Sequence, residues 1–89
     1  MALSQAIESE VIAICREVLD DPGITIESTS ATVANWDSLG HMHLIAALEA
    51  RYAVELDVLE MAEVDCVEML IGVVWNALQF ARGAVGGGS

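Results

Sequence analysis

The sequence predicts an all-α protein: a small four-helix bundle with three long helices, one short helix and a long loop between the first two. Apolar residues recur at spacings of three and four in three separate segments, which is typical of helices that bury one face. Apolar residues also make up 55% of the 89-residue chain, too many for a disordered acidic segment. A chain of this length builds one modest core, so the apolar faces must pack against one another.

The charge of the chain excludes several functions. Fourteen acidic and three basic side chains give a net charge of −11, and the three arginines lie far apart. Such a chain cannot neutralise a run of phosphates and is repelled by anionic lipid. The sequence has no membrane-spanning apolar stretch, no secretory signal, and no metal spacing in its two cysteines. We expect a cytoplasmic monomer that binds no nucleic acid, membrane or metal.

The first helix is expected from about Leu3 to Leu19. Its apolar face contains Leu3, Ile7, Val11, Ile14 and Val18, widened by Ile12, Cys15 and Leu19. Pro22 and its neighbours end the helix, because proline lacks a backbone donor and disfavours helix at the residue before it. Residues 24–37 lack helical periodicity and are expected to form an ordered loop. Four apolar residues should hold it to the helices: Ile24, Ile26, Val33 and Trp36.

The second helix is expected from Asp37 or Ser38 to Tyr52, and it carries two apolar stripes. The first stripe contains Leu44, Ile45, Leu48 and Tyr52. The second stripe contains Leu39, Met42 and Ala46. One stripe can face the core while the other is left for a partner, or both can belong to the core.

Two more helices are expected in the second half of the chain. A short one lies within residues 58–63. The last begins at Asp65, whose spacing from Glu68 suits an N-cap and its reciprocal partner, and runs to about residue 80 or 81. Gly83 should end it and leave residues 83–89 as a flexible, glycine-rich tail.

The sequence offers little support for catalysis. His41 and His43 are two residues apart and point to different faces of a helix, so they cannot bind one metal ion together. We therefore expect no enzyme. One position stands out: Ser38 lies where the long loop turns into the second helix. A serine there is usually a cap, but a helix N-terminus also favours an attached phosphate.

The segment NWDSLGHM, from Asn35 to Met42, resembles the modification motif of the acyl carrier protein family. The resemblance extends from about residue 6 to residue 80 and includes LIAALEARYAVEL, which is similar to the family's second helix and the turn after it. It implies the family's helical fold. It also implies a 4′-phosphopantetheine cofactor attached to Ser38, with Asp37 as the acidic residue that precedes the attachment site.

This resemblance implies a function for the whole domain, residues 1–82. The protein would hold acyl intermediates as thioesters on the arm and present them to partner enzymes without catalysing a reaction. The implied partners are a phosphopantetheinyl transferase and the acyl-loading and acyl-processing enzymes of one pathway. Leu39 and Met42 are similar to apolar positions where such partners dock, and Ala46 lies on the same stripe. An initiating Met1 just before the first helix favours a discrete protein.

The sequence departs from carriers of fatty-acid synthesis, which usually have several acidic residues along this helix. Here Gly40, His41 and His43 occupy that stretch, and Glu49 is the first acid after the motif. We therefore expect a specialised pathway such as polyketide biosynthesis. Three alternatives remain: a fatty-acid-synthesis carrier, a peptidyl or aminoacyl carrier, and an acidic helical adaptor without a cofactor.

Overall fold

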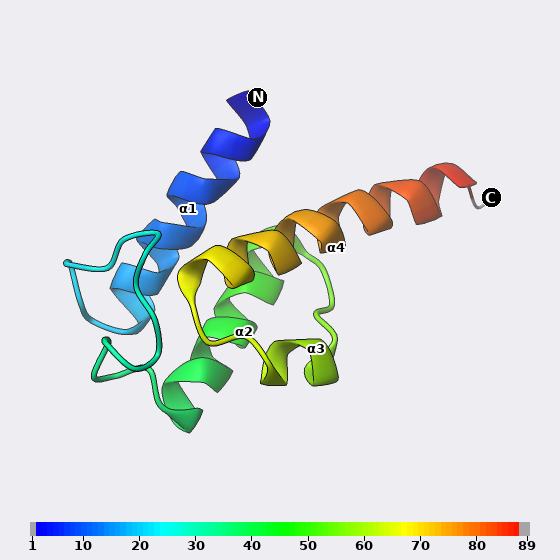
Figure 1. Cartoon of the computed structure of the whole chain (residues 1–89). Coiled ribbons are helices and arrows are strands. Elements are labelled where there is room, and N and C mark those ends of the chain that lie inside the picture. Colours follow the sequence, from blue (N-terminus) through cyan, green and yellow to red (C-terminus); the bar gives the residue numbers. More distant parts are fainter. Residues whose placement is uncertain (1, 88–89) are drawn as a thin grey trace.

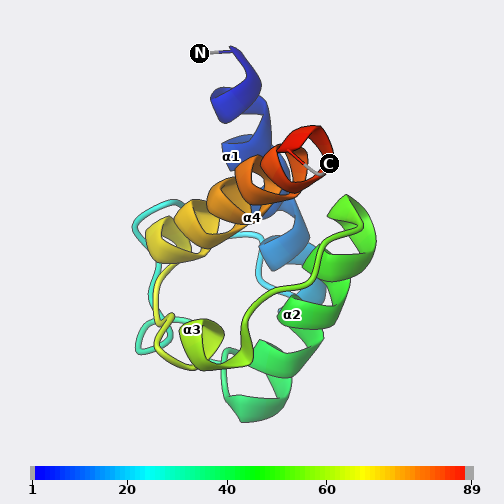
Figure 2. The same ribbon diagram turned by 90° about the vertical axis from the view of Figure 1, so that its right-hand side faces the viewer.

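The computed structural model describes the backbone of residues 2–87 and the side chains of residues 5–79. This part of the chain folds into four helices: α1 (Ala2–Val18), α2 (Ser38–Tyr52), α3 (Val58–Ala62) and α4 (Val67–Gly87). Helix α1 packs against both α2 and α4 (Figure 1, Figure 2). The short α3 contacts α4 as well. The predicted all-α four-helix bundle is confirmed. None of the described helices combines the length and apolarity needed to cross a bilayer.

The buried face of α1 is a row of residues at a spacing of four. The row consists of Ile7, Val11, Cys15 and, just after the helix, Leu19. Three other residues of the predicted face are half-buried at its edges: Ile12, Ile14 and Val18. The side chain of Leu3, also predicted for this face, lies outside the described residues. Full burial of one such side chain stabilises the fold by about 1.5–3 kcal/mol, so this row anchors α1 on the bundle.

Residues 24–37 form an ordered loop, as predicted. Ile24, Val33 and Trp36 are buried in the common core, and Ile26 is half-buried. Short local bonds shape the loop between these anchors. The Thr32 hydroxyl, for example, accepts a 3.0 Å hydrogen bond from the Thr29 N–H. The loop therefore brings Trp36 to the start of α2 in a fixed position.

A pair of backbone hydrogen bonds joins this loop to the start of α4. The Ser30 N–H donates to the Asp65 carbonyl at 2.8 Å, and the Val67 N–H donates to the Ser28 carbonyl at 3.0 Å. These two bonds make an isolated antiparallel bridge, and the described residues contain no full strand. The loop is thus tied to the start of α4.

Helix α4 differs from its prediction at both ends. It begins at Val67 because the bridge holds the two preceding residues extended, so the predicted start at Asp65 is wrong. It continues to Gly87, so the prediction that Gly83 ends it is also wrong. A glycine costs about 1 kcal/mol in a helix interior but does not forbid one, and no proline follows to remove a donor. Residues 88 and 89 of the predicted tail lie outside the described part.

Candidate functional site

Helix α2 begins at Ser38 because Asp37 caps it. The Asp37 Oδ1 accepts a 2.8 Å hydrogen bond from the Gly40 N–H, and the Asp37 carbonyl accepts one from the His41 N–H at 2.8 Å. Ser38 is therefore the first helical residue, and it is exposed. The capping role that a serine usually has at this place belongs to its neighbour, which leaves the Ser38 hydroxyl available for other chemistry.

Gly40 allows the loop to pack tightly on the first turn of α2. The residue is buried, and a Cβ atom there would collide with the Asn35 carbonyl oxygen and lie 3.0 Å from Cδ2 of Leu19. The Asn35 Nδ2 in turn donates a 2.7 Å hydrogen bond to the Leu19 carbonyl. From the sequence, Gly40 was expected only to mark a position without an acid. The sequence feature that could have indicated the close approach is a glycine within a helical turn, which is unfavourable unless a close backbone approach requires it.

His41 joins the loop to α3. The Trp36 Nε1–H donates a 2.9 Å hydrogen bond to the His41 Nδ1, and the His41 Nε2 lies 2.7 Å from the Met61 carbonyl oxygen. Indole Nε1 can only donate, so Nδ1 accepts and Nε2 carries the proton that bonds to the carbonyl. The two rings are also stacked, with centroids 6.3 Å apart and an interplanar angle of 19°. No sequence signal predicted this pairing.

An open groove of about 460 Å³ lies beside Ser38. Its lining comes from the loop, the first turn of α2 and the connection from α3 to α4: Ser30, Trp36, Asp37, Ser38, His41, Met42, Ala62, Val64 and Asp65. The lining is partly apolar, and the serine stands at the positive end of the α2 dipole. A group attached to the Ser38 hydroxyl would lie next to a helix N-terminus that favours an anion and next to the partly apolar lining of the groove.

The two apolar stripes of α2 have different surroundings. Leu44 and Leu48 are fully buried, as predicted for core positions. Leu39 and Met42 are 63% and 65% exposed, and Ala46 is exposed as well. The second stripe therefore remains at the surface, beginning next to Ser38, and Met42 also lines the groove.

The predicted separation of the two histidines is also seen, since His41 is engaged by two partners while His43 is exposed. Among the residues that the structure describes, no three His, Cys, Asp or Glu side chains cluster in a way that could hold a metal ion. Ser38 is the covalent attachment point that the sequence predicts. It lies at the start of α2, it lines the groove, and it is adjacent to the exposed stripe.

Comparison with known proteins finds a similarity among solved structures. No family model and no curated protein matches the chain. Among solved structures, the chain is similar to the solution NMR structure of a holo acyl carrier protein from Geobacter metallireducens. The two share 30% sequence identity over 84% of this chain and 88% of that chain, with a TM-score of 0.75.

Proposed function

This chain belongs to the acyl carrier protein family, and on that premise we propose that it carries acyl intermediates on a 4′-phosphopantetheine arm attached to Ser38. The observation that carries the proposal is the position of Ser38. It is exposed, it is the first residue of a capped helix, and it opens onto a partly apolar groove. When attached, the arm supplies a terminal thiol on which a cargo is held as a thioester.

The attachment step needs a hydroxyl nucleophile, which Ser38 supplies. A phosphopantetheinyl transferase would catalyse the reaction with coenzyme A: the Ser38 Oγ forms a bond to the phosphorus next to pantetheine, the pyrophosphate bond breaks, and adenosine 3′,5′-bisphosphate leaves. The hydroxyl proton passes to a base of the transferase. The first-turn N–H groups and the α2 dipole favour the resulting phosphodiester. The Asp37 carboxylate is held by the Gly40 N–H, which fixes the turn that displays the serine.

The exposed stripe Leu39, Met42 and Ala46 is proposed as the docking surface for the transferase and for acyl-loading and acyl-processing enzymes. Exposed apolar side chains grouped beside a reactive group mark a contact surface. Methionine suits a surface that meets several partners, because its unbranched chain adapts to different shapes. Each partner must bind and leave in turn, so a small interface is favoured.

A specialised pathway, such as polyketide biosynthesis, is proposed as the setting. The first turn of α2 has no acidic residue, and Glu49 is the first acid after Asp37. A fatty-acid-synthesis partner that binds a dense row of carboxylates along this helix would meet only Glu49 on α2. A test is to offer the loaded protein to a malonyl transferase of fatty-acid synthesis, to polyketide acyl transferases and to amino-acid-adenylating enzymes. Faster transfer from the first class than from the others would contradict the specialised assignment.

The carrier function is tested by intact-mass measurement after incubation with a broad-specificity transferase, coenzyme A and Mg²⁺. The expected result is the added mass of one phosphopantetheine, located at Ser38 by peptide fragmentation. Ser38→Ala should gain nothing, while the matched control Ser30→Ala, in the same groove, should load normally. Absence of loading on the unaltered chain would favour the adaptor class, and loading of Ser38→Ala would show that the site is elsewhere.

A further inference from the structure

The short helix α3 is held by few side chains. Of its five residues only Met61 is buried, while Val58 and Leu59 are 76% and 80% exposed. Its cap, Asp57, accepts hydrogen bonds from N–H groups of α3 itself and does not tie the helix to its neighbours. Among the described residues, the hydrogen bond that links the end of α3 to α2 is the one between His41 and the Met61 carbonyl. At the other end of α3 the Leu56 N–H, just before the helix, donates a 2.9 Å hydrogen bond to the Glu49 carboxylate.

His41 is itself fixed from the other side. Trp36 is 5% exposed and donates to the His41 Nδ1, which orients the ring and sets the tautomer that bonds to Met61. The side chain thus continues a hydrogen-bond chain from the loop through α2 to α3. Trp36 and His41 line one side of the groove beside Ser38, and Ala62, directly after Met61, lines it as well.

We propose that His41 is a positioning residue for the attachment site: the Trp36–His41–Met61 hydrogen-bond chain holds the end of α3 at a set distance from the first turn of α2 and so fixes the groove beside Ser38. The consequence for loading rests on the proposed function, whereas the hydrogen-bond chain itself does not. His43, on the same helix but exposed, has no part in it.

Four variants of the full chain test this proposal. His41→Ala removes both bonds. His41→Gln places an amide donor near the position of Nε2, and His41→Asn places an acceptor near that of Nδ1. His43→Ala is the matched control. The readouts are the indole N–H resonance of Trp36, assigned with Trp75→Phe, hydrogen exchange of the amides of residues 58–64, and the kcat and KM of transferase loading.

In His41→Ala the Trp36 resonance should shift, and exchange across residues 58–64 should rise by roughly two- to tenfold, the range for one lost hydrogen bond. His41→Gln should restore slow exchange without restoring the indole resonance, and His41→Asn should do the reverse. The KM for loading should rise in the variants whose amides exchange faster, and kcat should change little. His43→Ala should behave as the unaltered chain.

Unchanged exchange of residues 58–64 in His41→Ala, or an equal rise in His43→Ala, would overturn the proposal. Faster exchange with an unchanged KM would overturn the positioning role. If His41→Ala does not fold, the His41→Gln and His41→Asn variants test the proposal. Equal amide exchange of residues 58–64 in these two variants would contradict the Trp36–His41–Met61 hydrogen-bond chain. Should the unaltered chain fail to load, the proposed function is wrong, and the resonance and exchange measurements still decide whether His41 holds α3.

Discussion

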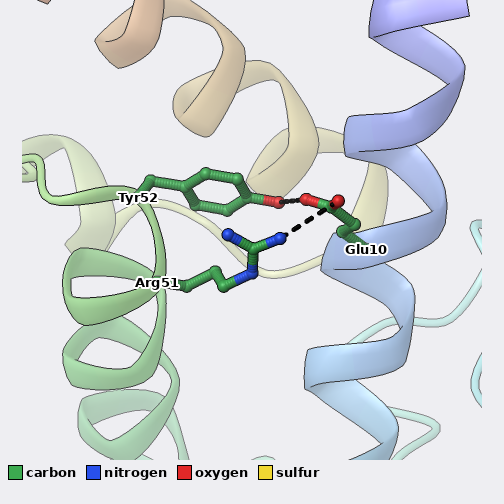
Figure 3. Close-up of polar contacts among 3 residues, drawn as sticks. All are labelled: Glu10, Arg51 and Tyr52. Atoms are coloured by element: carbon green, nitrogen blue, oxygen red, sulfur yellow. Dashed lines mark hydrogen bonds and ion pairs between the residues drawn. The ribbon is translucent and has the colours of Figure 1, made fainter.

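The hydroxyl of Tyr52, the last residue of α2, donates a 2.8 Å hydrogen bond to the Glu10 carboxylate on α1 (Figure 3). The second oxygen of that carboxylate lies 3.1 Å from the Arg51 guanidinium, which also stands 5.2 Å over the Tyr52 ring. The exposed ion pair contributes at most about 1 kcal/mol, so the hydroxyl bond and the half-buried ring are the firmer link. These contacts join α1 and α2 at the end of α2 opposite Ser38.

This link predicts a loss of stability at alkaline pH. Burial, the hydrogen bond to Glu10 and the charge of Glu10 raise the pKa of Tyr52 from 10.0 to about 12. Burial raises the pKa of the Cys15 thiol from 9.0 to about 11. In both cases the folded state retains a proton that the unfolded state has lost. These two groups therefore leave the free energy of unfolding unchanged below pH 9 and lower it as the pH rises from 9 toward 12.

Tyr52→Phe separates the two contributions. The variant should lose about 1 kcal/mol near neutral pH, the size of one hydrogen bond, and its stability should fall less steeply above pH 10. The loss of stability between pH 9 and about 11 that Cys15 causes should remain. Urea unfolding at a series of pH values measures both, and an identical slope above pH 10 in the variant and the unaltered chain would show that Tyr52 is not the group responsible.

A methyl group at position 40 should destabilise the protein. Gly40→Ala places a Cβ against the Asn35 carbonyl and Leu19, and overpacking of this kind costs roughly 1–3 kcal/mol. The matched control is Gly72→Ala on α4, where nothing lies within 4 Å of the new atom. It should gain about 0.5–1 kcal/mol from higher helix propensity. Thermal melts of the pair check this, and equal melting temperatures would argue against the close approach.

The two cysteines should differ in reactivity. Cys15 is fully buried, as expected from its place on the apolar face of the first helix, whereas Cys66 is half-buried. In a Ser38→Ala background, which keeps any arm thiol out of the assay, a disulfide reagent should modify Cys66 first. Cys15 should react only as the core opens, more slowly by a factor set by the opening equilibrium. Removal of the fast phase by Cys66→Ser identifies it, and two equal rates would contradict the burial of Cys15.

Met42→Glu tests the docking surface. Because Met42 is 65% exposed, the charge should change stability by no more than about 0.5 kcal/mol. Loading by the transferase should slow by about tenfold, as expected for a contact residue worth more than 1 kcal/mol. Met69→Glu is the control, since Met69 is 44% exposed on α4 and does not line the groove beside Ser38. A folded Met42→Glu protein that loads at the normal rate would remove this face from the transferase interface.

Local patterns predicted the parts of this structure that local physics decides. The spacing of Ile7, Val11 and Cys15 fixes the buried side of α1, because an amphipathic helix has only one apolar face to bury. The position of Ser38 at a helix start was also predictable, because the preceding loop has no helical periodicity and a capping residue stands at its end.

Contacts between distant segments were not predictable. The start of α4 was misplaced because bridge partners from the first loop hold Asp65 and Cys66 extended, and this tertiary pairing overrides a local capping pattern. The close approach at Gly40 and the bond between Trp36 and His41 depend on how the loop folds over α2. Spacing along one chain segment carries no information about such a fold.

The bridge between Thr29 and Cys66 also bears on the order in which the chain reaches its final shape. Its partners are far apart in sequence, so the entropy of closing a long loop is lost before either hydrogen bond forms. During synthesis the first loop can take its final position only after Val67 has left the ribosome. The loop leads directly into Ser38, so the surroundings of this proposed attachment site reach their final form only after that point. An enzyme that recognises the folded surroundings of Ser38 can therefore bind only after the start of the last helix has been synthesised.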